Sequence, residues 1–249
     1  MQYLELRKVA SSRLTLCAAI ALLISTLLSL AVIWRMVLYE VIYLFTGSLD
    51  AEASEAVMNT RTFFLMIPIT VFASLPVISV FMIYTNARSG ASMKRTGYTI
   101  LFVMMVALLI LCAVLLPFSL SALSNSHYYF TTCLALLTPF TLLLAFSAAS
   151  TLKTARDVVI NGYTYRNCSV LLPTVLIVSL CLKAANIVAL ILANSLPILI
   201  RLMPEYRVTS RTLFAGMIVA GAADFITTLL FTLISFRGRA ALAHRFEDQ

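Results

Sequence analysis

The chain has 249 residues, of which 61% are hydrophobic and 11% charged, and its formal net charge is +8. A soluble domain of this length carries roughly twice that share of charged residues and could not bury so much apolar surface. A soluble globular protein is therefore excluded. In a membrane protein, an excess of Lys and Arg is first explained by their enrichment in cytoplasmic loops. No nucleic-acid partner is therefore expected from the net charge.

Residues 1–13 precede the first apolar run and predict a short amphipathic helix. Tyr3, Leu6 and Ala10 recur at helical spacing, whereas Glu5 and Lys8 point elsewhere. Such a helix typically lies in the plane of the lipid headgroups. The alternative is a frayed tail whose charges only set the topology. No small-residue cleavage site follows the first apolar run, so a removable signal peptide is not expected.

Six apolar segments are each long enough to cross a hydrocarbon core about 30 Å thick. They cover residues 14–34, 63–84, 98–120, 130–152, 170–192 and 213–236. Gly, Asn, Asp, Ser or Pro residues punctuate the breaks between them. The predicted fold is therefore all-α and polytopic, with a six-helix transmembrane domain over 14–236, preceded by the helix at 1–13 and followed by a tail at 237–249.

Residues 195–211, between the last two crossings, contain an apolar hexamer that Arg201 interrupts and that Pro197 and Pro204 bracket. The hexamer is too short to cross a membrane. It predicts either a re-entrant or interfacial helix on the outer face or an ordinary loop.

Proline and small residues inside the crossings predict how the helices bend and pack. Bends are expected at Pro68, Pro76, Pro117, Pro139 and Pro173. Close helix contacts are expected at the small residues of the fourth and sixth crossings, namely Ala145, Ala149, Ser150, Gly216 and Ala220.

The basic residues predict the orientation. Most of the 18 Lys and Arg residues fall at the N-terminus, in the second and fourth connections and at the C-terminus. These are Arg7, Lys8, Arg13, Arg88, Lys94, Arg95, Lys153, Arg156, Arg166, Arg237, Arg239 and Arg245. Because cytoplasmic loops are enriched in Lys and Arg, both termini are expected in the cytoplasm, and the plasma membrane is the expected location.

No residue pattern predicts a catalytic, metal or nucleotide site. The five cysteines fall in or at the edge of apolar segments, as small buried hydrophobes do. His127 and His244 lie on opposite sides of the predicted membrane, and none of the seven glycines opens a phosphate-binding loop. The chain is therefore not expected to be an enzyme or to hold a metal or cofactor.

Two charged residues lie deep within predicted crossings. Lys183 is about 20 Å from the start of the fifth segment, and Asp224 is about 18 Å from the end of the sixth, at 1.5 Å per residue. A lone charge at this depth costs about 2.5–3.5 kcal/mol on insertion scales. Successive segments usually pack side by side, so a Lys183–Asp224 pair is expected.

Three interpretations of these charges are open from the sequence. The pair locks the fifth and sixth crossings together, or it lines a path for a substrate or ion. Alternatively, Lys183 reaches toward the membrane surface, or the two charges face different subunits.

The N-terminal stretch YLELRKVASSRLTLCAAIALLISTLL resembles the opening of permease subunits of the type-2 class of ABC exporters. Those subunits begin with an amphipathic cytoplasmic helix that carries Glu, Lys and Arg. The six crossings, the cytoplasmic termini, the chain length and the short element at 197–204 are similar too. The chain departs from the pattern between the second and third crossings, where NARSGASMKRTG, residues 86–97, is shorter than the usual ATPase-docking segment.

The resemblance implies a non-catalytic permease subunit with a separate ATP-binding subunit, a second permease copy or homologue, and an amphipathic or hydrophobic substrate such as a peptide, lipid or drug. The residues it implies as ATPase contacts are Glu5, Arg7, Lys8, Arg13, Arg88, Lys94 and Arg95. Basic inner loops are also expected from topology alone. Two alternatives are a stand-alone secondary transporter or channel that uses Lys183 and Asp224, and a polytopic scaffold or immunity-type protein.

Overall fold

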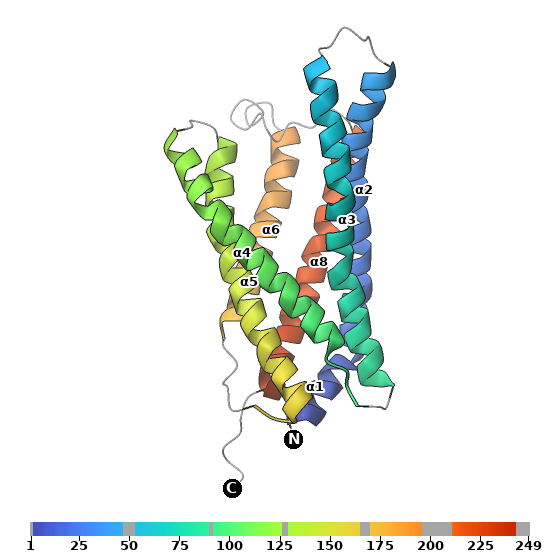
Figure 1. Cartoon of the computed structure of the whole chain (residues 1–249), viewed down its shortest axis with the longest axis vertical. Helices are drawn as coiled ribbons and strands as arrows, with labels where there is room; N and C mark the ends of the chain where they lie inside the picture. The colour runs from blue at the N-terminus through green and yellow to red at the C-terminus, as the bar shows by residue number, and fades with distance from the viewer. Residues whose placement is uncertain are drawn as a thin grey trace.

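A computed structural model describes the protein as a bundle of helices (Figure 1). The backbone is described for residues 2–46, 53–89, 92–125, 129–164, 170–195 and 211–242. Side chains are described for 2–34, 67–89, 92–117, 138–164, 170–192, 194–195 and 214–242. The helices in these ranges are α1 (Gln2–Ala10), α2 (Arg13–Thr46), α3 (Ala53–Arg88), α4 (Thr96–Asn125), α5 (Tyr129–Asn161), α6 (Leu171–Ser195) and α8 (Arg211–Leu242). No strand occurs among the described residues, which confirms the all-α prediction.

Within the part of the chain whose side chains are described, five helices are long and apolar enough to cross a membrane. The spans are Arg13–Trp34, Ile67–Arg88, Thr96–Pro117, Leu171–Leu192 and Phe214–Leu242. A helix satisfies its backbone hydrogen bonds internally, and these helices turn many large apolar side chains outward, as lipid requires. The chain is a multi-pass helical membrane protein. The fourth predicted crossing, 130–152, lies on α5, where the side chains of 130–137 are outside the described residues.

The helices extend past the crossings predicted from hydropathy. The helix α2 has 34 residues and α3 has 36, whereas a crossing needs about 20. Hydropathy identifies the part of a helix that lies inside the hydrocarbon. The helix itself continues beyond that part wherever the flanking residues tolerate the helical conformation. At the C-terminus, the predicted tail at 237–249 begins inside α8, which runs to Leu242. Two sequence predictions concern residues outside the described part. These are the short element at 197–204 and the location of His127 and His244 on opposite sides of the membrane.

The helices form two arms that meet at one end. In one arm, α2 packs against α3 and α8, and α8 packs against α6; in the other, α4 packs along α5. The α4–α5 arm approaches α3 near the end that carries the N-terminus and diverges from it with distance (Figure 1). Gly97 permits this approach, because a Cβ there would lie 2.8 Å from the Ser79 carbonyl oxygen.

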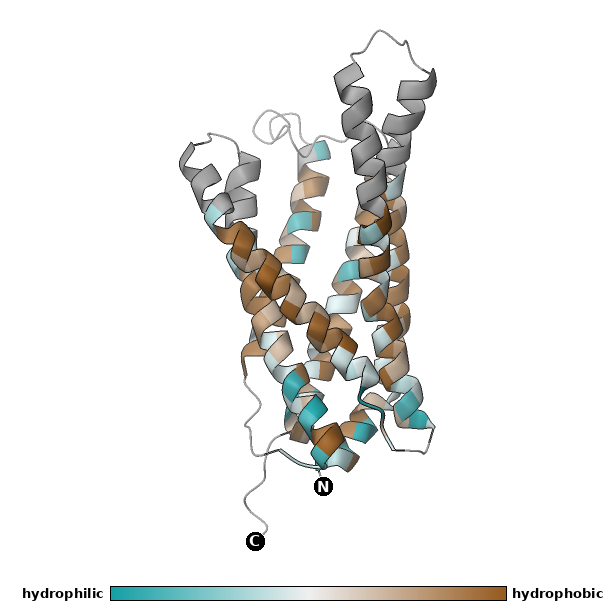
Figure 2. Cartoon of the chain, in the orientation of Figure 1, coloured by the Kyte–Doolittle hydropathy of each residue, from teal (hydrophilic) through white to brown (hydrophobic). Residues whose placement is uncertain are grey.

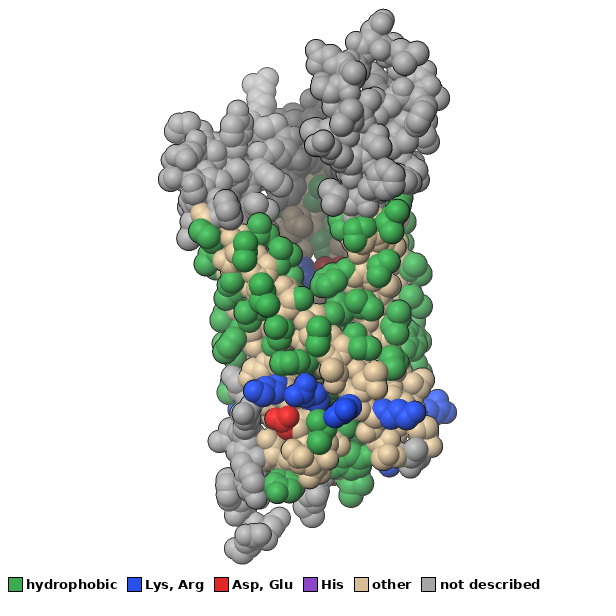
Figure 3. Space-filling view, in the orientation of Figure 1, with side chains coloured by type: hydrophobic (Ala, Val, Ile, Leu, Met, Phe, Trp, Pro, Cys, Tyr) green, Lys and Arg blue, Asp and Glu red, His purple; other side chains and the backbone are tan. Residues whose placement is uncertain are grey.

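Charged side chains gather at the end where the arms meet, which we call the basic end. A belt of Lys and Arg crosses the molecule there, below the apolar faces of the helices (Figures 2 and 3). The described Lys and Arg residues on α1, at the helix ends nearest to it and in the α3–α4 connection are Arg7, Lys8, Arg13, Arg88, Lys94, Arg95, Lys153, Arg156, Arg237 and Arg239. Arg156 of α5 lies 5.2 Å from the centre of the Phe102 ring of α4, which joins these helices at the belt.

The α1 helix packs on the bundle at the basic end. Its residues Leu6 and Ala10 are buried in a cluster with Ala87 of α3, Val158 of α5 and Leu242 of α8. The periodic apolar face predicted from the sequence is therefore present, but it contacts protein where a headgroup-plane helix would contact lipid. Helix ends from both arms supply enough apolar surface to cover it.

Of the small residues predicted to make close helix contacts, Ala145 and Ala149 of α5 are buried, whereas Ser150 is exposed. Ala220 of α8 is buried, and a Cβ on Gly216 would contact Val32 of α2 at 3.4 Å. Pro68, Pro76, Pro117 and Pro139 lie inside helices. Pro173, for which a bend was predicted, is instead in the first turn of α6, where proline removes no helical hydrogen bond.

Candidate functional site

The candidate site lies between α6 and α8, where Lys183 and Asp224 meet. Lys183 Nζ is 2.8 Å from Asp224 Oδ2 and donates a hydrogen bond of 2.6 Å to Thr228 Oγ1. Both helices are apolar on either side of these residues, so neither charge lies at an end of its span. An ion pair with a hydroxyl bridge lowers the cost of placing both charges at this depth.

Thr228 completes the site and was missed by the sequence analysis. It lies four residues after Asp224, on the same face of α8, and its hydroxyl donates to the Asp224 carbonyl oxygen at 2.9 Å. Its oxygen then accepts from Lys183. The i, i+4 spacing to an intramembrane acid is the signal that could have identified it.

Glycine sets how closely the two helices approach at the site. A Cβ on Gly221, three residues before Asp224, would lie 3.3 Å from Ile187 Cγ1 of α6. Any larger residue at position 221 would press on α6 one turn from the ion pair. The close approach allows the Lys183 ammonium to reach Asp224 and Thr228 together.

The charged pair is not sealed inside the protein. The Lys183 side chain is 31% exposed and that of Asp224 is 45% exposed. Figure 3 shows basic and acidic side chains deep in a hollow between the arms, apart from the belt at the basic end. Among the described residues, Lys183 and Asp224 are the charged pair that lies away from that belt.

The site keeps unused hydrogen-bonding capacity. An ammonium has three donors, and Lys183 uses two of them on Asp224 and Thr228. Within the described part of the chain, no hydrogen bond reaches Oδ1 of Asp224. The pair can therefore bind a polar group that enters the hollow without first breaking its own contact.

Residues expected to contact an ATPase divide into four groups in the structure. Glu5 and Lys8 form an exposed ion pair of 2.7 Å on the outer face of α1. Lys94 and Arg95 are exposed on the connection between α3 and α4. Arg7 is different, because its Nε donates to the Ala87 carbonyl oxygen at 3.0 Å and thereby fastens α1 to α3.

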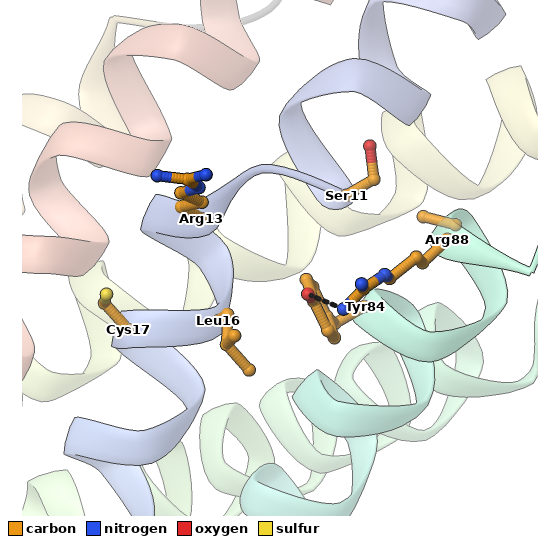
Figure 4. Close-up of a pocket in the computed structure, with 7 residues that line it drawn as sticks. Ser11, Arg13, Leu16, Cys17, Tyr84 and Arg88 are labelled. Atoms are coloured by element: carbon orange, nitrogen blue, oxygen red, sulfur yellow. Dashed lines mark hydrogen bonds between the residues drawn. The ribbon is translucent and has the colours of Figure 1, made fainter.

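Arg13 and Arg88, the remaining two, line one pocket at the basic end (Figure 4). Arg88 Nη1 donates a 3.1 Å hydrogen bond to the Tyr84 hydroxyl. The structure therefore separates two surfaces that the sequence analysis had grouped together. One is the outer face of α1 with the α3–α4 connection, and the other is the Arg13–Arg88 pocket.

Side chains near the start of α1 tie it to two chain connections. The Tyr3 hydroxyl accepts a 2.7 Å hydrogen bond from the Met93 backbone N–H, between α3 and α4. The Gln2 side chain pairs with the backbone of Thr164, beyond the end of α5, at 2.8 and 3.3 Å. Hydrogen bonds thus attach α1 to the α3–α4 connection and to the segment after α5.

Where side chains are described, no group of three or more His, Cys, Asp or Glu residues is placed to hold a metal ion. Cys17, Cys112 and Cys181 are free thiols, and Cys17 and Cys181 are exposed, although all five cysteines were predicted to be buried. Outward-facing positions on a membrane helix contact lipid, which accepts a thiol as readily as a protein core does. Cys133 and Cys168 have no described side chain.

No protein-family model, curated protein or solved structure matches this chain.

Proposed function

We propose that this chain is the membrane permease subunit of an ATP-driven exporter of the ABC type-2 class, with ATP hydrolysed by a separate subunit. The observation that carries the proposal is the half-exposed Lys183–Asp224 pair in a hollow between two helical arms. A pair that only locked two helices together would be expected to exclude solvent, whereas a path needs polar groups that a passing molecule can reach.

In this proposal α5 also crosses the membrane, which brings the number of crossings to six, and the basic end faces the cytoplasm. The helix α5 has 33 residues, which is long enough for a crossing, and it follows α4 and precedes α6 in the chain. With α5 the number of crossings is even, so both termini would lie on the same side of the membrane. The belt of Lys and Arg supports this orientation through the enrichment of such residues in cytoplasmic loops. The plasma membrane is the proposed location.

The proposed substrate is amphipathic or hydrophobic, such as a peptide, lipid or drug. Apolar side chains dominate the faces beside the hollow, and the described charges within it are one ion pair (Figures 2 and 3). Few fixed charges leave little with which to recognise a strongly polar solute. A second copy of the chain, or a homologue, would complete the path as the resemblance implies.

The proposed ATPase contact is the outer face of α1 together with the α3–α4 connection. Leu4, Glu5 and Lys8 are exposed on α1, and Lys94 and Arg95 are exposed on the connection. An exposed leucine within charged side chains is a suitable centre for a protein contact. Since α1 is tied to both arms, its displacement by an ATPase would shift the arms relative to each other.

A second candidate is a secondary transporter that couples substrate movement to a proton or ion at Asp224. The exposure of this carboxylate to the hollow favours it, because a coupling carboxylate must exchange its partner during transport. In that case, purified protein in liposomes would carry out ion-dependent flux without any ATPase.

Purification in mild detergent separates the two candidates. The exporter proposal expects an ATP-binding subunit to remain bound and the complex to hydrolyse ATP. A triple variant, Leu4→Asp with Glu5→Lys and Lys8→Glu, should lose that subunit, while the control Arg237→Gln should keep it. A chain that purifies without an ATPase and moves ions alone in liposomes would overturn the exporter proposal.

Cysteine labelling tests the orientation. A cysteine at position 94, in a chain whose native cysteines are replaced by serine or alanine, should react with a membrane-impermeant maleimide only after the membrane is opened. Reaction in intact cells would place the basic end outside and contradict the proposal.

A further inference from the structure

The pocket at the basic end has a composition suited to an anion at a membrane surface. Its volume is about 580 Å³, and Ser11, Arg13, Leu16, Cys17, Tyr84 and Arg88 line it. Figure 4 shows the Arg88 side chain extending from α3 toward α2 and ending beside Tyr84, whereas the Arg13 guanidinium, at the start of α2, is turned away from Arg88. Both arginines contribute positive charge to the lining of the pocket, which favours an anion there.

Neither guanidinium has an acidic partner in the described part of the chain. The ion pairs found there are Glu5–Lys8 and Lys183–Asp224. Arg88 binds the Tyr84 hydroxyl, and because that oxygen accepts the bond, the hydroxyl proton can still be donated. The pocket thus presents three donor groups and no carboxylate, and arginine is well matched to phosphate oxygens.

The depth of the pocket places it at headgroup level. Arg13 is the first residue of the α2 span and Arg88 is the last residue of the α3 span, so both mark the edge of the apolar zone. Basic side chains at that level are typical of headgroup contacts.

An apolar track leads from the pocket into the membrane along α2. Leu16 lines the pocket, and Ile20, Leu23 and Leu27 follow on the same face of the helix and are exposed. A free phosphate would leave this track unused, whereas a phospholipid would place its acyl chains on it.

We infer that the Arg13–Arg88 pocket binds the phosphate of an anionic phospholipid from the leaflet at the basic end, with the acyl chains along α2. The inference requires only that the basic end lies at a membrane surface, so it stands whether or not the chain works with an ATPase. Bound lipid would join the start of α2 to the end of α3.

The test compares full-length protein in nanodiscs of phosphatidylcholine with and without phosphatidylglycerol, counting retained lipid by native mass spectrometry. The wild type should retain phosphatidylglycerol preferentially, and Arg13→Gln with Arg88→Gln should reduce that retention at least about tenfold, as loss of charge-assisted bonds implies. The matched control, Lys94→Gln with Arg95→Gln, removes equal charge from the same end. Equal loss in test and control variants would overturn the inference in favour of general surface attraction.

Two further measurements keep the test decisive if the double variant folds poorly. In the wild type, phosphatidylglycerol should slow alkylation of Cys17, which lines the pocket, without slowing that of Cys181, which is exposed within α6. Inorganic phosphate at millimolar concentration should not reproduce this protection. Unchanged Cys17 reactivity, or protection by phosphate alone, would show that no phospholipid occupies the pocket.

Discussion

Thr228 lies between the two charges of the membrane-embedded pair, accepting a hydrogen bond from Lys183 and donating one to the Asp224 backbone. The ammonium is thereby held by two groups of the same helix turn of α8. The cation comes from α6, and among the described residues both oxygens that it contacts come from α8. Substitutions at these residues can therefore distinguish a role in helix packing from a role in a transport path.

Removing one charge of the pair should destabilise the fold more than removing both. Lys183→Met or Asp224→Leu alone leaves an uncompensated charge, which costs about 3–5 kcal/mol in a fully buried pair. We expect less here, about 1–3 kcal/mol, because both side chains are partly exposed. The double variant should unfold near the wild-type temperature in detergent but lose transport. A double variant with wild-type transport would show that the pair is purely structural.

Exchanging the charges tests the contact itself. Lys183→Asp with Asp224→Lys should restore most of the stability that either reversal alone removes, because the attraction is the same in both orientations. Thermal unfolding of the four proteins provides the comparison. A swap no more stable than the single reversals would show that the two side chains do not interact.

Thr228→Val should weaken the site without changing its shape. The variant removes the acceptor of Lys183, and we expect a loss of about 1–2 kcal/mol in unfolding free energy. Thr227→Val is the matched control, because among the described residues that hydroxyl donates to the Ala223 carbonyl of its own helix and to no group of α6. Equal losses for both valines would contradict the assigned role of Thr228.

Glycine substitutions should rank by the space around them. Gly97→Ala should lower the free energy of unfolding by about 1–3 kcal/mol, because the new Cβ would clash with the backbone of α3, which cannot move away as a flexible side chain could. Gly238→Ala, with nothing within 4 Å, should instead stabilise α8 by up to about 1 kcal/mol. Unfolding temperatures measured side by side give the order. A neutral Gly97→Ala would mean that α4 and α3 do not approach as described.

Tyr3→Phe should loosen the attachment of α1 to the connection before α4. The ring stays in place, but the Met93 N–H loses its acceptor, at a cost of about 1 kcal/mol. Amide hydrogen exchange should speed up at α1 and around residue 93. Lys8→Gln, which removes an exposed ion pair, should leave exchange there unchanged.

Composition and apolar length were sufficient to predict a helical membrane protein, because the bilayer accepts few other structures. The spacing of Tyr3, Leu6 and Ala10 likewise identified the apolar face of α1. The surface that covers this face was not predictable, since it is assembled from the ends of α3, α5 and α8, which are distant in sequence. Hydropathy also could not locate the helix ends, because helices α2 and α3 continue past the apolar stretch.

By itself, the sequence determined that the chain is built from membrane helices and that Lys183 and Asp224 need partners, because a lone charge in hydrocarbon costs free energy wherever it lies. Only the tertiary structure decided the distance between them, the participation of Thr228 and the hollow that exposes them. It also brought Arg13 and Arg88 to one pocket. The physical reason is that helix rotation and approach are set by side-chain packing between helices, and Gly221 and Gly97 have that effect only against neighbours that the linear pattern does not specify.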